Sequence, residues 1–170
     1  MDFADLMHKR YSVRQYQDKK VEDEKLAVIL EAARIAPTGC NKQPFKLIVA
    51  QSDEAVARVA KAGNMHGAPL AIIVCGEKGK AWVRTCDQKN IVDIDASIVT
   101  TQMMLQATEL GLGSVWICNF NPEIIRKEFN LNDGLEAINI LLLGYAAGEP
   151  ASAERFAKQR KVIQELVIYK

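Results

Sequence analysis

Four short apolar segments of the chain predict the strands of a sheet. Residues 45–51 (FKLIVAQ) and 69–76 (PLAIIVCG) consist mainly of apolar side chains, the pattern of strands that are buried. Residues 114–118 (SVWIC) and 138–145 (INILLLGY) have a similar character. We therefore expect a sheet of about four strands.

Helical spacing of apolar positions predicts helices between these strands. In residues 23–36, apolar side chains recur at helical spacing, acids occupy the first turn, and Pro37 ends the pattern. Residues 121–129 predict a helix with Asn121 as its cap and a proline in its first turn. Further segments predict a short helix at 2–9, a helix near 53–62, and a last helix or strand at 162–167.

Residues 91–110 predict a long helix that is apolar on most of its circumference, and Gly111 and Gly113 end it. Such a helix belongs in the middle of a core rather than on a surface. The predicted fold class is therefore α+β, with helices packed on the sheet and the long helix central. No repeat or low-complexity linker divides the chain, so we expect a single domain, residues 1–170.

Composition and charge narrow the class of protein. The 170 residues are 49% hydrophobic and 25% charged, which is ordinary for a globular domain. No apolar run approaches the ~20 residues that span a bilayer, and the acidic start lacks the features of a signal peptide. The net charge of +1 argues against nucleic acid or a membrane as partner. We expect a cytoplasmic protein.

The cysteines and histidines do not form a metal-binding pattern. His8 and His66 are far apart, and the cysteines contain no CxxC pair. We expect no metal, and four free thiols.

Arg10, Ser12 and Arg14 alternate along a segment, residues 10–16, that we expect to be extended. Two guanidinium groups and a hydroxyl on one side suit a phosphate and a neighbouring anionic group. The alternative is a surface edge strand with alternating charge. Lys158 and Arg160 repeat the two-residue spacing of cations near the C-terminus, where a solvated basic tail is the alternative.

The loop 36–44 (APTGCNKQP) has two amide side chains, Asn41 and Gln43, directly before a buried strand. Amides can donate and accept hydrogen bonds at the pyrimidine edge of a flavin, although a polar turn beside a helix end would look the same. Gly111, Gly113 and Ser114 are small enough for a flat molecule to approach the backbone. No GxGxxG or phosphate-loop motif follows a strand, so a resident dinucleotide is not expected.

These motifs, in this order, resemble the FMN-dependent nitroreductase family over residues 10–160. The matching pieces are RYSVRQY, APTGCNKQPF, GNMHGAP, DIDASIVTTQMMLQATELGLGSVWI, LLLGYAAGEP and AKQRK. The resemblance implies an α+β sandwich, with a mostly antiparallel sheet flanked by helices and the long helix at the interface of a homodimer. It also implies one FMN at each of two sites in that interface.

The resemblance assigns residues to the flavin by their match to family motifs. It gives the phosphate and the pyrimidine edge to Arg10, Ser12 and Arg14, with Tyr11 alongside, and it gives the phosphate also to Lys158 and Arg160. It gives a loop from the partner subunit to Pro37, Thr38 and Asn41, with Gln43 in support. It places Asn64 near the ring, and Trp116, Ile117 and Cys118 on the strand end that passes the flavin.

The chain departs from the family pattern in three places. Thr38-Gly39 replaces a common serine pair, Phe45 replaces a usual tryptophan, and the segment 76–90 is short. Longer members have inserted helices there that shape substrate choice, so the oxidant is less well defined than the cofactor.

The resemblance implies an oxidoreductase in which NADH or NADPH reduces the flavin at N5 and a nitroaromatic, quinone or similar small oxidant then replaces it. No side chain is assigned as a general acid or base. The alternatives are a non-catalytic protein that stores or senses FMN, and a flavoenzyme of the same fold that performs reductive dehalogenation or flavin fragmentation. Three side chains keep two interpretations each. His66 is a proton donor or a plain loop residue, Trp82 is a lid over the flavin or packs against the partner subunit, and Cys118 is a redox thiol or an inert packing group.

Overall fold

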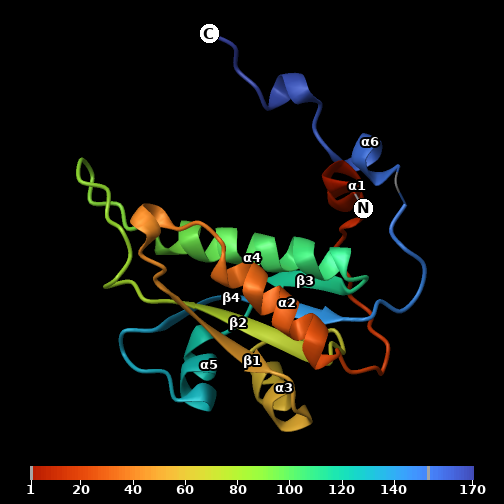
Figure 1. Cartoon of the computed structure of the whole chain (residues 1–170), viewed down its shortest axis with the longest axis horizontal. Helices are drawn as coiled ribbons and strands as arrows, with labels where there is room; N and C mark the ends of the chain where they lie inside the picture. Colours follow the sequence, from red (N-terminus) through yellow and green to blue (C-terminus); the bar gives the residue numbers. More distant parts are fainter. Residues whose placement is uncertain (1, 153) are drawn as a thin grey trace.

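A four-stranded antiparallel sheet forms the centre of the computed structural model, which describes residues 2–152 and 154–170 (Figure 1). Its strands are β1 (Phe45–Ala50), β2 (Leu70–Gly76), β3 (Gly113–Ile117) and β4 (Glu136–Gly144), in the order β1-β2-β4-β3. Each neighbouring pair is antiparallel. The predicted four strands are confirmed, and β1 and β3 are the two edges of the sheet.

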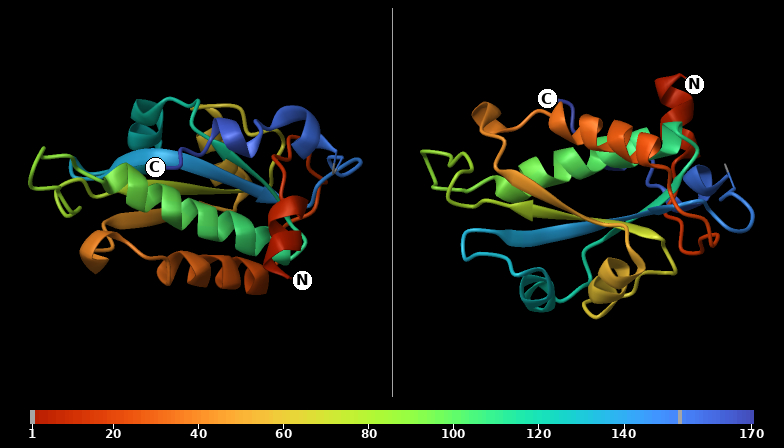
Figure 2. Two further views of the ribbon diagram at one scale, coloured as in Figure 1. Left: turned by 90° about the horizontal axis from the view of Figure 1, so that it is seen from above. Right: turned by 60° about the horizontal axis from the view of Figure 1, so that its bottom comes forward.

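Helices cover both faces of this sheet (Figure 2). Helices α2 (Asp23–Arg34) and α4 (Val92–Glu109) lie on one face, and α3 (Asp53–Ala60) and α5 (Pro122–Phe129) lie on the other. Two shorter helices, α1 (Phe3–Lys9) and α6 (Arg155–Gln159), and two 3-10 turns, η1 (Gly39–Asn41) and η2 (Ile163–Glu165), complete the elements. The predicted α+β sandwich is confirmed.

Alternation along the strands builds one core on each face. Ile72 of β2 and Leu141 of β4 pack toward α2 and α4, whereas their neighbours Ile73 and Leu142 pack toward α3 and α5. All four side chains are almost completely buried. The continuous apolar runs of the sequence are explained by this double coverage.

The observed helices differ from the predicted ones mainly in the end of α2 and in the presence of α6. Helix α2 ends at Arg34 rather than at residue 36, because the residue before Pro37 is disfavoured in the helical conformation. Helix α6 was not expected from the sequence. For residues 162–167 the sequence predicted either a helix or a strand, and the structure has a helical turn there, η2 (Ile163–Glu165). Within the described residues, we find no helix with the length and apolar character needed to cross a membrane.

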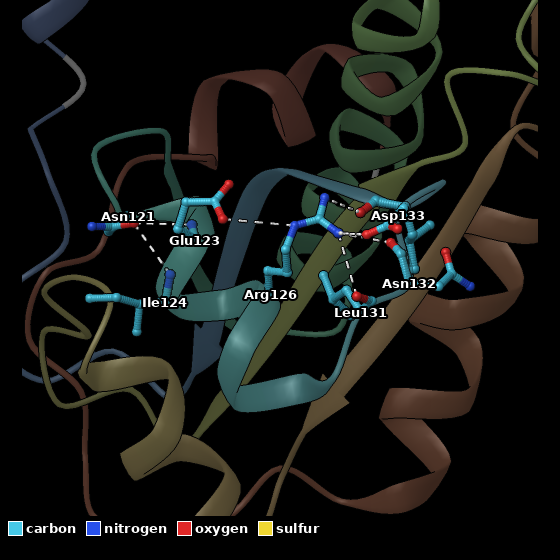
Figure 3. Close-up of polar contacts among 8 residues, drawn as sticks. Asn121, Glu123, Ile124, Arg126, Leu131, Asn132 and Asp133 are labelled. Carbon is cyan, nitrogen blue, oxygen red and sulfur yellow. Dashed lines mark hydrogen bonds and ion pairs between the residues drawn. The ribbon is translucent and has the colours of Figure 1, made fainter.

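Arg126 of α5 fastens the connection that leads into β4 (Figure 3). Its guanidinium donates hydrogen bonds to the carbonyl oxygens of Asn132 at 2.9 Å, Leu135 at 3.0 Å and Leu131 at 3.4 Å. One partly buried cation thereby satisfies three carbonyls of a loop that has no other regular structure. The clamp fixes where β4 enters the sheet.

We expect Arg126→Ala to lower the free energy of unfolding by about 2 kcal/mol, because charge-assisted hydrogen bonds to three carbonyls are lost. Arg126→Lys should recover only part of this loss, since an ammonium lacks the planar fork of donors. Denaturant titration gives the values. Lys127→Ala, a change at the exposed neighbouring cation, is the matched control. Equal stability of Arg126→Ala and Lys127→Ala would contradict the clamp.

Candidate functional site

The segment 10–16 lies beside the start of β3, as its predicted extended conformation allows. Ser12 forms a parallel bridge with Ser114, and the N–H of Val13 donates to the Ser114 carbonyl at 2.9 Å. Val13 is buried while Ser12 and Arg14 are exposed, so the predicted alternation is confirmed. The Arg14 guanidinium folds back and donates to the carbonyl of Ser12 at 3.5 Å.

Arginines from both ends of the chain converge beside this segment. Arg155 donates to the carbonyl oxygens of His8 and Arg10, and the His8 ring stands edge-on to Phe156 at 5.3 Å. These contacts dock α6 on α1 (Figure 1). Burial, and then the positive charges of Arg160 and Arg155, lower the pKa of the Arg10 guanidinium. The corner therefore concentrates positive charge that a bound anion would stabilise.

Two residues of the basic tail make contacts that the sequence did not indicate. Arg155, which the sequence did not single out, contacts the Arg10 backbone directly. Lys158 instead pairs with Glu154 at 2.7 Å and is exposed. Because its charge is already paired, Lys158 adds less to the cationic corner than Arg10, Arg155 and Arg160. The cationic corner therefore consists of these three arginines.

A cavity of about 350 Å³ adjoins the cationic corner. Arg10 and Tyr11 line it from one side, and Thr108 and Glu109 at the end of α4 line it from another. Gly111 and Gly113 also line this cavity. A side chain at position 113 would overlap the side chain of Val13, so glycine is needed for the close packing of the segment 10–16 on β3.

The loop 37–43 lies at the opposite end of α4, where its backbone is strained. Cys40, Asn41 and Gln43 have φ values of 49°, 52° and 50°, a left-handed conformation that residues with side chains rarely adopt. The Thr38 hydroxyl accepts from the Gln43 N–H at 2.9 Å, and Gln43 Nε2 donates to the Asn41 carbonyl at 3.1 Å. These bonds gather both amide side chains on an exposed turn, directly after Pro37.

The loop is anchored to the body of the protein at Gly39. Its N–H donates to Oδ1 of the buried Asp95 in α4 at 2.8 Å. A side chain at position 39 would collide with Ile91 and crowd Trp82, so glycine is needed for this close approach. Trp82 is half-buried beside Gly39 of its own chain.

The end of β3 carries the third group of predicted residues. Trp116 and Ile117 are partly buried, and Cys118 is exposed, so the interpretation of Cys118 as a buried packing group is wrong. The indole Nε1 of Trp116 is buried without a hydrogen-bond partner among the described residues. Asn64 lies on the neighbouring loop, close to Ile117.

The polar side chains near this strand end are partly committed to local structure. Asn64 Oδ1 accepts from the N–H of His66 at 2.8 Å, and His66 has a left-handed φ of 51°. His66 thus fits its interpretation as a turn residue.

All four cysteines are free thiols, and burial raises the pKa of Cys75 to about 12. The described residues contain no cluster of three or more His, Cys, Asp or Glu side chains suited to a metal ion.

The loop 37–43 and the cationic corner are far apart within one chain. The loop leads into β1 and the segment 10–16 borders β3, and these edge strands are three strand spacings apart, roughly 14 Å. Along α4, the 14 residues from Asp95 to Glu109 span about 21 Å. Figure 1 shows the η1 turn and α1 near opposite ends of α4. One chain therefore carries two separate halves of the predicted site.

An apolar groove of about 790 Å³ joins these two ends along the exposed side of α4. Its walls come from α1, α2 and the length of α4, from Asp93 to Glu109. Large apolar side chains remain exposed there, with Phe3 at 63%, Ile35 at 61% and Ile94 at 47%. The long helix is thus covered by the sheet on one side and open on the other, instead of being enclosed by its own chain.

The antiparallel sheet and the helices on both faces define an α+β sandwich, and the cationic corner lies at one of its edges. The sequence profile described as Nitroreductase family matches residues 7–63 and 58–145. The chain belongs to the nitroreductase family, as its sequence motifs predicted.

Solved structures and curated relatives agree with this assignment. A nitroreductase family protein from Clostridium difficile 630 is 58% identical, with a TM-score of 0.98 over 100% of this chain and 99% of that one. An FMN-dependent nitroreductase from Clostridium difficile R20291 is 30% identical, with a TM-score of 0.76 over 92% and 96% of the two chains. The FMN reductase [NAD(P)H] of Bacillus subtilis is 26% identical over 92% of this chain and 68% of its own length.

Proposed function

We propose that this chain is an FMN-dependent oxidoreductase that takes hydride from NADH or NADPH and delivers it to a nitroaromatic, quinone or similar small oxidant. In this proposal residues 1–170 act as one domain, two copies form a homodimer, and each of its two interface sites holds one FMN. The observation that carries the proposal is the separation of the predicted flavin residues into two halves at opposite ends of α4.

A second copy docked antiparallel along the groove would unite these halves. A twofold axis across the middle of α4 places the first turn of one α4 beside the last turn of the other. The loop 37–43 of each subunit then lies beside the cationic corner of its partner. The exposed Ile94 and Ile35 side chains would be buried in the same step, which supplies the driving force.

The residues of the site fit FMN in charge and in hydrogen bonding. The cationic corner, with Ser12 and Arg14, would hold the phosphate. Arg155 and Arg160 add their positive charges to that of Arg10, and charged donors of this kind bind a phosphate strongly. Tyr11 lies alongside. Lys158 would also contact the phosphate in this proposal, by exchanging its exposed salt bridge with Glu154 for the anion.

The ring lies farther along β3 in this proposal. The loop from the partner, Pro37, Thr38, Asn41 and Gln43, presents its amides to the pyrimidine edge, and Asn64 lies near the opposite side. The backbone at Trp116, Ile117 and Cys118 passes the ring. When bound there, FMN supplies the chemistry of accepting and donating hydride.

In this mechanism the protein binds the flavin, orients its ring and shields one face of it. The loop and the β3 end fix the plane of the ring so that one face stays open to successive ligands. The short segment 76–90 leaves that face accessible, which suits alternate binding of nicotinamide and oxidant at one place. We place the protein in the cytoplasm, where the exposed thiols of Cys40, Cys86 and Cys118 remain reduced.

The test is anaerobic reduction of the purified protein. We expect yellow protein with about one FMN per chain, whose absorbance near the flavin maximum is lost on addition of NADH or NADPH and returns with a quinone or nitroaromatic. Bound flavin that neither nicotinamide reduces would instead identify a protein that stores or senses FMN. Colourless protein that takes up no added FMN would overturn the proposal.

A further inference from the structure

A buried carboxylate in α4 has no explanation in packing alone. Asp95 is 1% exposed, and its Oδ1 accepts a hydrogen bond from the Gly39 N–H at 2.8 Å. Its second oxygen, Oδ2, has no partner among the described residues. A carboxylate buried with one hydrogen bond disfavours folding, and its place in the first turn of α4, where the helix dipole favours an acid, offsets only part of that cost.

The segment that Asp95 holds is the strained loop. Three residues with side chains, Cys40, Asn41 and Gln43, have left-handed backbone conformations directly after the anchored glycine. Such conformations persist only where the surroundings enforce them, and they concentrate at binding sites. Gly39 is where this loop is fixed to α4, with Ile91 packed against it.

We propose that Asp95 is the positioning residue of the flavin loop. Its hydrogen bond fixes Gly39, and Gly39 fixes the direction in which Asn41 and Gln43 face. This inference rests on the proposed function, because these amides meet the flavin ring in the partner's half of the site. Asp95 itself touches no flavin atom. Its removal therefore affects recognition of the ring and leaves recognition of the phosphate unchanged.

The test combines flavin titrations with amide hydrogen exchange on the full-length dimer. Asp95→Ala should weaken binding of FMN and of riboflavin by the same factor, about tenfold, because both share the ring. In the flavin-free protein, the Gly39 amide should exchange faster than in wild type. Glu54→Ala, which removes an exposed acid from the first turn of α3 on the other face of the sheet, should change neither quantity.

Asp95→Asn removes the negative charge and keeps the hydrogen bond, so it separates the two effects. It also tests the proposal if the alanine variant does not fold. Asparagine keeps an acceptor for Gly39, so we expect protected exchange and flavin affinities within about threefold of wild type. Affinity loss in Asp95→Asn with Gly39 still protected would overturn the proposal, since charge rather than position would be responsible. Unchanged affinities in Asp95→Ala, or a loss confined to FMN, would also overturn it.

Failure of the proposed function would have a different signature. If wild-type protein binds neither FMN nor riboflavin, the flavin site itself is wrong. If wild type binds both and Asp95→Ala binds both equally well, only the role of Asp95 is wrong.

Discussion

Arg10→Ala and Arg160→Ala should each weaken FMN binding by roughly 10- to 150-fold. The ribityl phosphate carries about 1.5 to 2 negative charges at neutral pH, as phosphate monoesters do. Loss of one charge-assisted hydrogen bond costs roughly 1.5–3 kcal/mol, and ~1.4 kcal/mol corresponds to a factor of ten in affinity. The positive charge of Arg160 already lowers the pKa of Arg10, so the two side chains act on a common region. Fluorescence titration with FMN gives the affinities.

Riboflavin supplies the control for this prediction because it keeps the ring and lacks the phosphate. Its affinity should fall much less than that of FMN in both variants. The double variant should lose less than the sum of the two single losses, since a shared ligand couples the sites. Equal losses for FMN and riboflavin would show that the arginines act on the ring or on the fold. An unchanged FMN affinity in Arg160→Ala would show that Arg160 does not bind the phosphate, and the alternative of a solvated basic tail would then hold.

Ile94→Glu should raise the dissociation constant of the homodimer at least about 100-fold. Ile94 lies in the groove on α4 and is 47% exposed in the single chain, so the change leaves the core of the subunit intact. In a twofold dimer it buries two unpaired carboxylates, each at a cost of several kcal/mol. Flavin binding should be lost with the dimer, because each site needs both subunits.

Val28→Glu is the matched control for the interface. Val28 is 43% exposed on α2, close to the exposure of Ile94, but it does not line the groove. Sedimentation at micromolar concentration should show a dimer for this variant and a monomer for Ile94→Glu. A monomeric Ile94→Glu protein that still binds FMN with wild-type affinity would contradict the shared site.

The elements of the fold were predictable because their apolar patterns are strong. The long helix was expected at 91–110 and runs from Val92 to Glu109, since its length and the glycines after it leave little choice. Helix α6 was not predictable in the same way. It has five residues, and its position depends on contacts with His8 and Arg10, which lie more than 140 residues away in the sequence.

The site was predictable in its residue types but not in its anchors. Asp95 looks in the sequence like an ordinary acid of a first helical turn, as Asp93 does. The available signal was its place in the stripe of Val92, Ala96 and Val99, the side of α4 that is buried. The left-handed conformation of Cys40 could not be foreseen, because no glycine or turn motif marks that position. The salt bridge of Lys158 with Glu154 has the i,i+4 spacing of a helical ion pair, but that spacing is informative only once helix α6 is known.

Subunit complementation tests the central claim, that each flavin site is built from the cationic corner of one subunit and the loop of the other. One subunit has Arg10→Ala and Arg160→Ala, and the other has Asn41→Ala and Gln43→Ala. Two different affinity tags allow the heterodimer to be isolated, and titration counts its FMN sites.

The homodimer of each variant should have no site of wild-type affinity. In the heterodimer, one site combines two unaltered halves and the other combines both defects. We predict one FMN bound per heterodimer with wild-type affinity. If the corner and the loop of the same subunit formed the site, both sites of the heterodimer would be weakened, and the absence of any wild-type site would contradict the account.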